Sequence, residues 1–526
     1  MKEKAKVSRP NFLFIITDQQ RADYLGCAGH SVLKTPHIDT LAATGTRFEQ
    51  FHVATPVCMP NRASLLTGRY PSVHGLRQNG EHLSYRANTF VDVLAANGYQ
   101  TVAVGKSHVQ PMTMHPPEQR FDPASVGLIA EAWKDDPNDY GHETPERYES
   151  DQKYEIPIPY YGYGKIDMVG NHGDLADGHY LQWLRTKSSH ADAWRDRKNQ
   201  LPHNYKCPQA YRTPIPEELY STTYIRDRSL RHLEGMRDST QPFFMFVSFP
   251  DPHHPFSPPG KYWDMYDPAD FDVPLPWGSH QNPTPPMRYL REQQERGARN
   301  DKGQEAFTAE PDEIREAMAL TCGMISMIDD AVGMLVAKLK EIGKYDETVI
   351  VFNSDHGDYL GDFGLLLKGA MPLRSINRVP FIWSDPASRS ANVSSALAST
   401  IDLAPTILER AGIKGYNGIQ GKSLLGCMDG SSAHRENLLI EHQDAFKRYD
   451  LSRFAMIRTL ITSRWRFSVW RGESWGELYD MTEDPHETHN LWNDAAYGEI
   501  RKELGETLTQ QLLENVDQSP HAKKRA

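Results

Sequence analysis

Cysteine is scarce in this sequence. Its 526 residues include five cysteines, and no two of them form a Cys-x-x-Cys pair. A disulfide scaffold or a zinc knuckle needs clustered cysteines, so neither is expected here. The five positions are Cys27, Cys58, Cys207, Cys322 and Cys427. Any special role for one cysteine must therefore come from its own surroundings.

Basic blocks and long apolar runs are also missing. Lys and Arg total 58 against 69 Asp and Glu, which gives a net charge of -11, and basic residues cluster only in the tail AKKRA at 522–526. This balance argues against nucleic acid as a partner. No apolar run approaches the 18 residues of a membrane helix, and the run at 12–16 is too short for a signal peptide, so we expect a cytoplasmic protein without a membrane segment. An anionic substrate would require a pocket that is locally positive.

Length and periodicity predict an α/β fold. A chain of this size can bury a large core, and we expect one large domain and a smaller one. Over the first 125 residues, short β-branched runs alternate with helical patterns, as in a large, mostly parallel sheet flanked by helices. The expected strands lie at 11–17, 47–53 and 99–104, and the expected helices begin at about 36, 61 and 89.

Changes in composition divide the rest of the chain. From about 126 to 240 the sequence is rich in Pro, Tyr, Gly and charge, which indicates an insertion that carries specificity over one end of the sheet. Later expected elements are strands at 242–249, 348–354 and 379–383, a long helix from about Pro311 to Gly343, short antiparallel strands after 430 and a final helix near 494–516. We therefore expect a catalytic domain at 1–430 and a C-terminal subdomain at 431–526. We also favour a homo-oligomer, because such insertions and tails often pack between chains.

Polar stretches follow four of the predicted strands. They are TDQQ after the first strand, GKSH after Val104, PDPHHPF after Phe249 and SDHGD after Phe352. Open parallel sheets bind ligands outside the carboxyl ends of their strands. The four stretches are therefore expected to converge on one site.

Two of these stretches carry candidate metal ligands. Asp18, Gln19, Asp355 and His356 offer carboxylate and amide oxygens and one imidazole. Such an oxygen-rich set suits calcium, magnesium or manganese. Alternatively, Asp18 caps a helix and SDHGD is a polar turn. The occurrence of both stretches together favours the metal site.

Lysine and histidine side chains are candidates for handling an anion. Lys106 and His108 flank a serine after a strand, so both would reach one site if that segment stays extended. His253 and His254 lie between prolines, which would fix one imidazole rigidly. Lys368 follows an apolar run. The alternatives are a surface lysine and solvent-facing loop histidines.

Cys58 precedes an expected helix and lies close to Arg62 in the sequence. A helix N-terminus and a guanidinium both lower the pKa of a thiol and attract an oxyanion. The residues alone thus indicate a reactive thiolate, such as a hydrolase nucleophile. They do not explain why a divalent metal would lie beside it.

The segment CMPNRASLLTGR at 58–69 resembles the sulfatase signature, Cys-x-Pro-x-Arg followed by Thr-Gly-Arg. Similar stretches occur in order along nearly the whole chain, among them NFLFIITDQQRAD, TPHIDTLAATGTRF, SDHGDYLGDFGLLLKG and LYDMTEDPHETHNL. By these motifs the sequence is identified as a member of the sulfatase family, in the alkaline-phosphatase-like superfamily. The resemblance implies that fold, with a smaller C-terminal α+β subdomain carrying an antiparallel sheet. It also implies that a formylglycine-generating enzyme oxidises Cys58 to formylglycine, whose hydrate is the nucleophile.

The resemblance further implies a metal site. One divalent ion would be bound, Ca²⁺ in the first place and Mn²⁺ or Mg²⁺ as alternatives. Its ligands would be Asp18, Gln19, Asp355, His356 and the modified Cys58.

Roles in catalysis are implied in the same way. Arg62 and Lys106 would hold the formylglycine oxygens and the substrate anion, and His108 would be the base that breaks down the covalent intermediate. His253 and Lys368 would contact the ester and assist its leaving group. Asn79 is a further candidate for contact with a substrate oxygen.

The implied activity is hydrolysis of a small sulfate ester to alcohol and sulfate. Two departures from the common pattern keep an alternative open, because many sulfatases have Asp where Gln19 stands and Asn where His356 stands. The ligand set Asp18, Gln19, Asp355 and His356 also resembles that of the phosphonate monoester and phosphodiester hydrolases of the family. A catalytically silent binding protein on this fold is disfavoured, since every expected catalytic position is filled.

Overall fold

The centre of the molecule is an eight-stranded sheet. The computed structural model describes residues 9–113, 136–150, 152–429, 434–519 and 523–524. The strand order is β11-β2-β10-β8-β1-β6-β4-β5, and of these strands only β10 runs antiparallel to its neighbours. The strands are β1 (Asn11–Thr17), β2 (Thr46–Phe48), β4 (Gln100–Gly105), β5 (Lys165–Met168), β6 (Phe243–Ser248), β8 (Thr348–Ser354), β10 (Phe381–Ser384) and β11 (Asn392–Ser394). The prediction of a large, mostly parallel sheet is confirmed.

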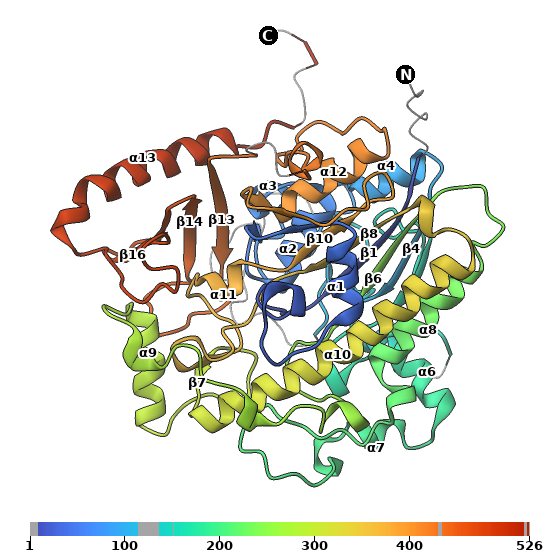
Figure 1. Cartoon of the computed structure of the whole chain (residues 1–526), viewed down its shortest axis with the longest axis horizontal. Coiled ribbons are helices and arrows are strands. Elements are labelled where there is room, and N and C mark those ends of the chain that lie inside the picture. Colours follow the sequence, from blue (N-terminus) through green and yellow to red (C-terminus); the bar gives the residue numbers. More distant parts are fainter. Residues whose placement is uncertain (1–8, 114–135, 151, 430–433, 520–522, 525–526) are drawn as a thin grey trace, which may run out of the picture.

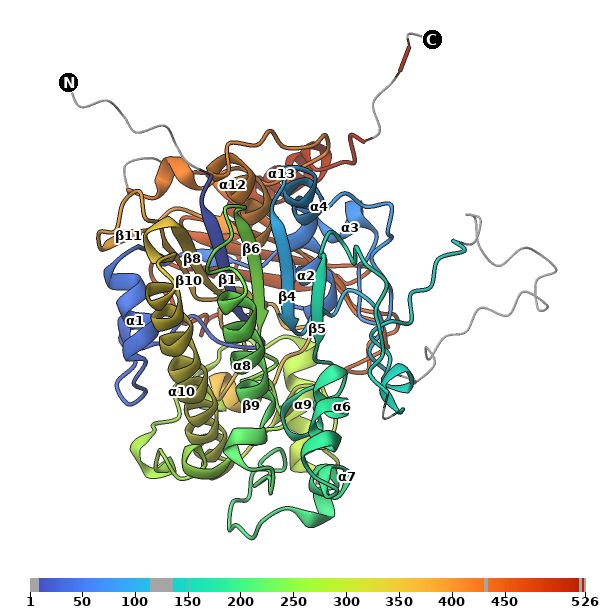
Figure 2. The same ribbon diagram turned by 90° about the vertical axis from the view of Figure 1, so that its right-hand side faces the viewer.

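Helices cover both faces of this sheet (Figure 1, Figure 2). One face packs against α2 (Cys58–Thr67), α4 (Phe90–Ala96) and α12 (Leu403–Arg410). The other packs against α1 (Pro36–Ala43), α6 (His179–Lys187), α8 (Ser221–Glu234) and α10 (Pro311–Glu341). Shorter elements are α3 (Pro71–His74), α7 (Ala191–Arg195), α9 (Pro285–Glu295), α11 (Arg374–Asn377) and the strand pairs β3 (Phe51–His52) with β12 (Ala398–Ser399) and β7 (Phe307–Thr308) with β9 (Leu365–Leu366).

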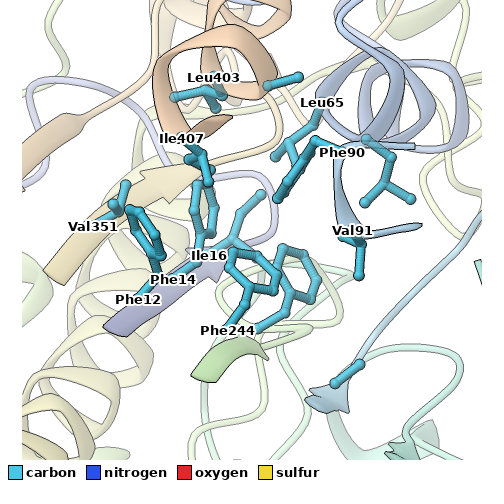
Figure 3. Packing of buried hydrophobic residues seen from close by; sticks show 14 of the residues in the cluster. Phe12, Phe14, Ile16, Leu65, Phe90, Val91, Phe244, Val351, Leu403 and Ile407 are labelled. Atoms are coloured by element: carbon cyan, nitrogen blue, oxygen red, sulfur yellow. The ribbon is translucent and has the colours of Figure 1, made fainter. Parts of the chain in front are cut away.

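The first strand shows why its sequence is continuously apolar. Phe12, Phe14 and Ile16 point to one face of the sheet, and Leu13 and Ile15 point to the other. Figure 3 shows the first group packed with residues of α4 and α12. Because both faces of a central parallel strand are buried, every position in it is apolar.

Helix α10 corrects one expectation. Among the described residues it is the one helix with the length and composition of a membrane span, with a mean hydropathy of 1.5 over 18 residues. We expected no segment to approach this limit. Since 78% of that window is buried inside the protein, the apolar surface of α10 is used in core packing.

Two local predictions were wrong in their boundaries. The helix expected from about residue 61 begins at Cys58, because Val57 is still extended and a proline such as Pro60 is tolerated in the first helical turn. The single strand expected at 47–53 is divided into β2, which joins the main sheet, and β3, which pairs with β12. The nucleophile candidate therefore lies inside the first turn of α2.

The predicted insertion at 126–240 contributes to the sheet itself. Residues 126–135 lie outside the described residues, but β5 from this range pairs with β4 at the sheet edge. Two of the covering helices, α6 and α8, come from the same range. A segment that sequence reasoning placed above the sheet thus also extends it.

The C-terminal part forms a separate antiparallel sheet, as predicted. It runs in consecutive order through β13 (Asn437–Gln443), β14 (Met456–Thr462), β15 (Trp465–Trp470) and β16 (Gly476–Asp480), followed by α13 (Gly498–Glu514). Its core is continuous with Ala54, Tyr70 and Ile401 of the larger part. The domain boundary expected at 430 lies outside the described residues.

Candidate active site

The four polar stretches meet at the carboxyl edge of the central strands. Asp18 follows β1, Lys106 follows β4, His253 lies beyond β6 and Asp355 follows β8. All four strands are parallel and adjacent, in the order β8-β1-β6-β4. The expected convergence is therefore found, and these side chains are buried in one cluster.

Cys58 lies in the middle of this cluster. Its Sγ is 3.0 Å from His356 Nε2 and 3.0 Å from Lys368 Nζ. Burial is the largest influence and raises the pKa of the thiol, but Lys368, His356 and Lys106 together outweigh it and hold the pKa at about 7. The buried sulfur is thus placed where a negative charge is stabilised.

Arg62 lies one turn after Cys58 on α2, and its guanidinium bonds to groups at the ends of three strands. Its Nε donates to Asp355 Oδ2 at 2.7 Å, and Nη1 donates to Ser248 Oγ and to the Lys106 carbonyl, both at 2.8 Å. Its Nη2 has no hydrogen-bond partner among the described residues and lies 3.5 Å from Asp18 Oδ2. One guanidinium therefore links the carboxyl ends of β8, β6 and β4. Its Nη2 is the nitrogen that these bonds leave available to a ligand.

Lys106 and His108 are both buried, but the segment between them does not stay extended. His108 has a left-handed backbone with φ of 57°, held by a hydrogen bond from its N–H to Glu143. The Lys106 ammonium contacts Asp18 and lies 2.7 Å from His172 Nε2. Within the part of the chain that the structure describes, Nδ1 of His108 has no hydrogen-bond partner, and burial, reinforced by Lys106, lowers the pKa of the ring well below the usual value.

Lys368 connects the nucleophile to the histidines. Its Nζ lies 2.9 Å from His253 Nε2 and donates to Gln19 Oε1 at 3.2 Å. His253 and His254 are 1% and 0% exposed, so the alternative of solvent-facing loop histidines is wrong. The alternative of a surface lysine is wrong for Lys106, which is 0% exposed.

Several predicted metal ligands face one another. Ligand atoms of Asp18, Cys58, Asp355 and His356 lie within 4.8 Å of one another. Asp18 Oδ1 is buried and accepts no hydrogen bond from any residue that the structure describes, which leaves a carboxylate oxygen able to bind a cation. The Lys368 ammonium already contacts three predicted ligands, Gln19, Cys58 and His356. The donor set thus fits a hard divalent ion.

Asn79 lies beside this cluster rather than in it. Its side-chain oxygen accepts a hydrogen bond of 3.3 Å from the N–H of Met59, the residue after Cys58. This contact places the amide next to the nucleophile helix. The amide nitrogen remains the group with which Asn79 would meet a substrate oxygen.

Sequence reasoning missed His172. This histidine follows β5 in the stretch GNHGD, and its ring stacks on His253 with centroids 3.5 Å apart. The available signal was the same one used for the other strands, a polar stretch directly after a strand. It was overlooked because β5 is a four-residue edge strand within the expected insertion.

A comparison with protein families decides the relationship. The family model described as Sulfatase matches residues 10–413. The chain belongs to the sulfatase family. A second model, described as N-sulphoglucosamine sulphohydrolase, C-terminal, matches residues 361–514 of this sulfatase. Family membership makes the chain a sulfuric ester hydrolase.

Individual relatives span almost the whole sulfatase chain. An arylsulfatase of Clostridium perfringens is 28% identical over 516 residues, covering 96% of this chain and 94% of its own. The multifunctional alkaline phosphatase superfamily protein PehA of Trinickia caryophylli is 28% identical over 547 residues, covering 98% and 97%. The crystal structure of phosphonate monoester hydrolase of Agrobacterium radiobacter has a TM-score of 0.76 at 24% identity and covers 97% of both chains, which shows the same fold.

Proposed function

We propose that this sulfatase hydrolyses the sulfate ester of a small alcohol, with Cys58 converted to formylglycine by a maturation enzyme. The main support is the position of Cys58 Sγ in the first turn of α2, 3.0 Å from both Lys368 Nζ and His356 Nε2. An anionic ester at this atom meets cations although the chain carries a net charge of -11. The formylglycine hydrate supplies one hydroxyl for attack and a second whose deprotonation permits release of sulfate.

We infer that one divalent ion, Ca²⁺ in the first place, is held by Asp18, Gln19, Asp355, His356 and residue 58. The support is that Asp18 Oδ1 has no hydrogen-bond partner among the described residues and that Gln19, Cys58 and His356 all contact the ammonium of Lys368. Asp355 lies within 4.8 Å of the other ligand atoms. A bound ion supplies Lewis-acid stabilisation of the attacking oxygen. Mn²⁺ and Mg²⁺ are the alternatives that oxygen-rich donors allow.

Basic side chains of the chain bind the substrate anion and transfer protons. Arg62 Nη2 and the Lys106 ammonium bind the anionic oxygens of the ester, where preorganised positive groups lower the barrier. Lys368 and His253, in contact at 2.9 Å, give a proton to the departing alcohol, which is a poor leaving group as an alkoxide. His108, neutral among these cations, accepts a proton in the second half of the reaction.

A phosphonate monoester or phosphodiester is the second candidate substrate. Gln19 and His356 stand where many sulfatases have Asp and Asn, and a phosphonate monoester hydrolase shares the fold. The test is kcat/KM for an aryl sulfate against an aryl phosphonate on the same preparation. We expect the sulfate to be preferred, and a higher value for the phosphonate would reverse the assignment.

Mass spectrometry of the peptide that contains Cys58 tests the nucleophile. We expect loss of the thiol sulfur and the mass of an aldehyde or its hydrate. Cys207, which is also buried but lies outside the site, is the internal control and should remain a thiol. An unmodified Cys58 in fully active protein would refute the formylglycine mechanism.

A further inference from the structure

His172 occupies a position in the site to which neither the motifs nor the family resemblance assigns a role. It follows the edge strand β5, and its side chain is buried. Its Nε2 lies 2.7 Å from the Lys106 ammonium, which also contacts Asp18. The ring therefore touches a group that, under the proposed function, binds the substrate anion.

The direction of this hydrogen bond is fixed by chemistry. A lysine ammonium has three N–H donors and no acceptor, so His172 Nε2 must accept and carries no proton. Asp18 takes a second N–H of the same ammonium. Two of the three N–H groups of Lys106 are thus held by the protein. The third has no partner among the described residues and, under the proposed function, donates to a substrate oxygen.

The face of the same ring supports a second active-site residue. His172 and His253 are stacked with an interplanar angle of 10° and a centroid distance of 3.5 Å. The far side of His253 lies against His254 at 4.1 Å. His253 is therefore clamped between two rings while its Nε2 faces Lys368 at 2.9 Å.

We propose that His172 is a positioning residue that aims the Lys106 ammonium at the substrate anion and clamps the ring of His253. This inference rests on the proposed function, because it assumes that Lys106 binds the ester oxygens. Nε2 at the edge of the ring orients Lys106, and the face of the ring supports His253. Each part can be removed by a different substitution.

Two variants separate the parts. His172→Phe keeps a ring to stack on His253 but removes the acceptor for Lys106, whereas His172→Gln keeps an acceptor and removes the ring. Hydrogen bonds to charged groups contribute about 1.5–3 kcal/mol, so kcat/KM of His172→Phe should fall about ten- to a hundredfold. His172→Gln should recover part of this loss. The control is His179→Phe, the same exchange at a buried histidine on α6 that bonds only to backbone groups of Met168 and Tyr154.

A Lys106→Ala background distinguishes positioning from general support of the fold. If His172 acts through Lys106, adding His172→Phe to Lys106→Ala should lower kcat/KM by less than threefold. If His172→Phe lowered kcat/KM by the same factor in wild type and in Lys106→Ala, the inference would be overturned. The inference would also be overturned if the His172→Phe single variant had a kcat/KM within threefold of wild type and the same thermal unfolding midpoint.

Binding of inorganic sulfate, measured by calorimetry on the same proteins, keeps this test independent of turnover. The Kd should rise about tenfold in His172→Phe and stay unchanged in His179→Phe. A protein that binds sulfate but hydrolyses neither ester would refute the proposed function and leave the Kd values to decide the role of His172. Equal Kd values in His172→Phe and wild type would overturn that role.

Discussion

A single methyl group at Gly105 should disturb the site directly. It ends β4, immediately before Lys106, with φ of 107°. A Cβ at this position would lie 1.8 Å from the carbonyl oxygen of Ser248, whereas real Cβ contacts do not fall below 3.0 Å. The Gly105→Ala variant must therefore separate β4 from β6 by about 1.2 Å at the point where Ser248 also accepts from Arg62.

Such a shift moves two anion-binding groups at once. A misplacement of about 1 Å can reduce catalysis about a hundredfold, so we expect kcat/KM of Gly105→Ala to fall by about that factor. Backbone strain from the positive φ adds about 1–2 kcal/mol of destabilisation. The assay is steady-state hydrolysis of an aryl sulfate, combined with the thermal unfolding midpoint of the same sample.

Gly98→Ala is the matched control. Gly98 also has a positive φ, of 84°, but no atom of the described residues lies within 4 Å of the position its Cβ would take. It should show the strain without the displacement, and hence lower stability with nearly normal kcat/KM. Equal activity of the two variants would refute the argument that close contact between β4 and β6 sets the position of Lys106.

Three further predictions concern the nucleophile, the C-terminal sheet and pH. Cys58→Ala should abolish turnover while the unfolding midpoint changes by only a few degrees, because a small thiol contributes little packing. Arg466→Ala removes the cation that pairs with the buried carboxylates of Glu477 and Glu487. The free energy of unfolding measured by urea denaturation should therefore fall by about 3–5 kcal/mol. Burial is the largest influence on Asp402 and raises its pKa, but Arg435, His434 and the N–H of Lys422 together outweigh it, so the pKa lies below the usual value. The stability that this carboxylate confers is present above about pH 4 and is lost on acidification. The thermal unfolding midpoint of Asp402→Asn should therefore fall less steeply than that of wild type from about pH 5 to 3.

The convergence of the site could be predicted from the sequence because central parallel strands are apolar throughout. A run such as NFLFIIT ends sharply at Asp18, and the carboxyl ends of such strands share one edge. The same rule located Lys106, His253 and Asp355. What it supplied was the position of each residue in the sheet, without the direction of its side chain.

Side-chain directions depended on local backbone geometry that the sequence does not reveal. The left-handed turn at His108 and the orientation of Arg62 toward Asp355 arise from tertiary contacts. His172 was missed for a related reason. Its strand, KIDM, is short, mixed in polarity and at the sheet edge, so it lacks the long apolar pattern that marks β1 and β8.

The segments on either side of α2 bond to the C-terminal sheet, and this bears on the newly made chain. Glu441 in β13 bonds to the carbonyl of Ala54 and to Ser72, on either side of Cys58. These bonds cannot form until about 380 further residues have been made. At roughly 5–20 residues per second, that interval is about 20–80 seconds. Cys58 is 2% exposed in the folded protein, so the maturation enzyme proposed above would find this side chain most accessible before these contacts have formed.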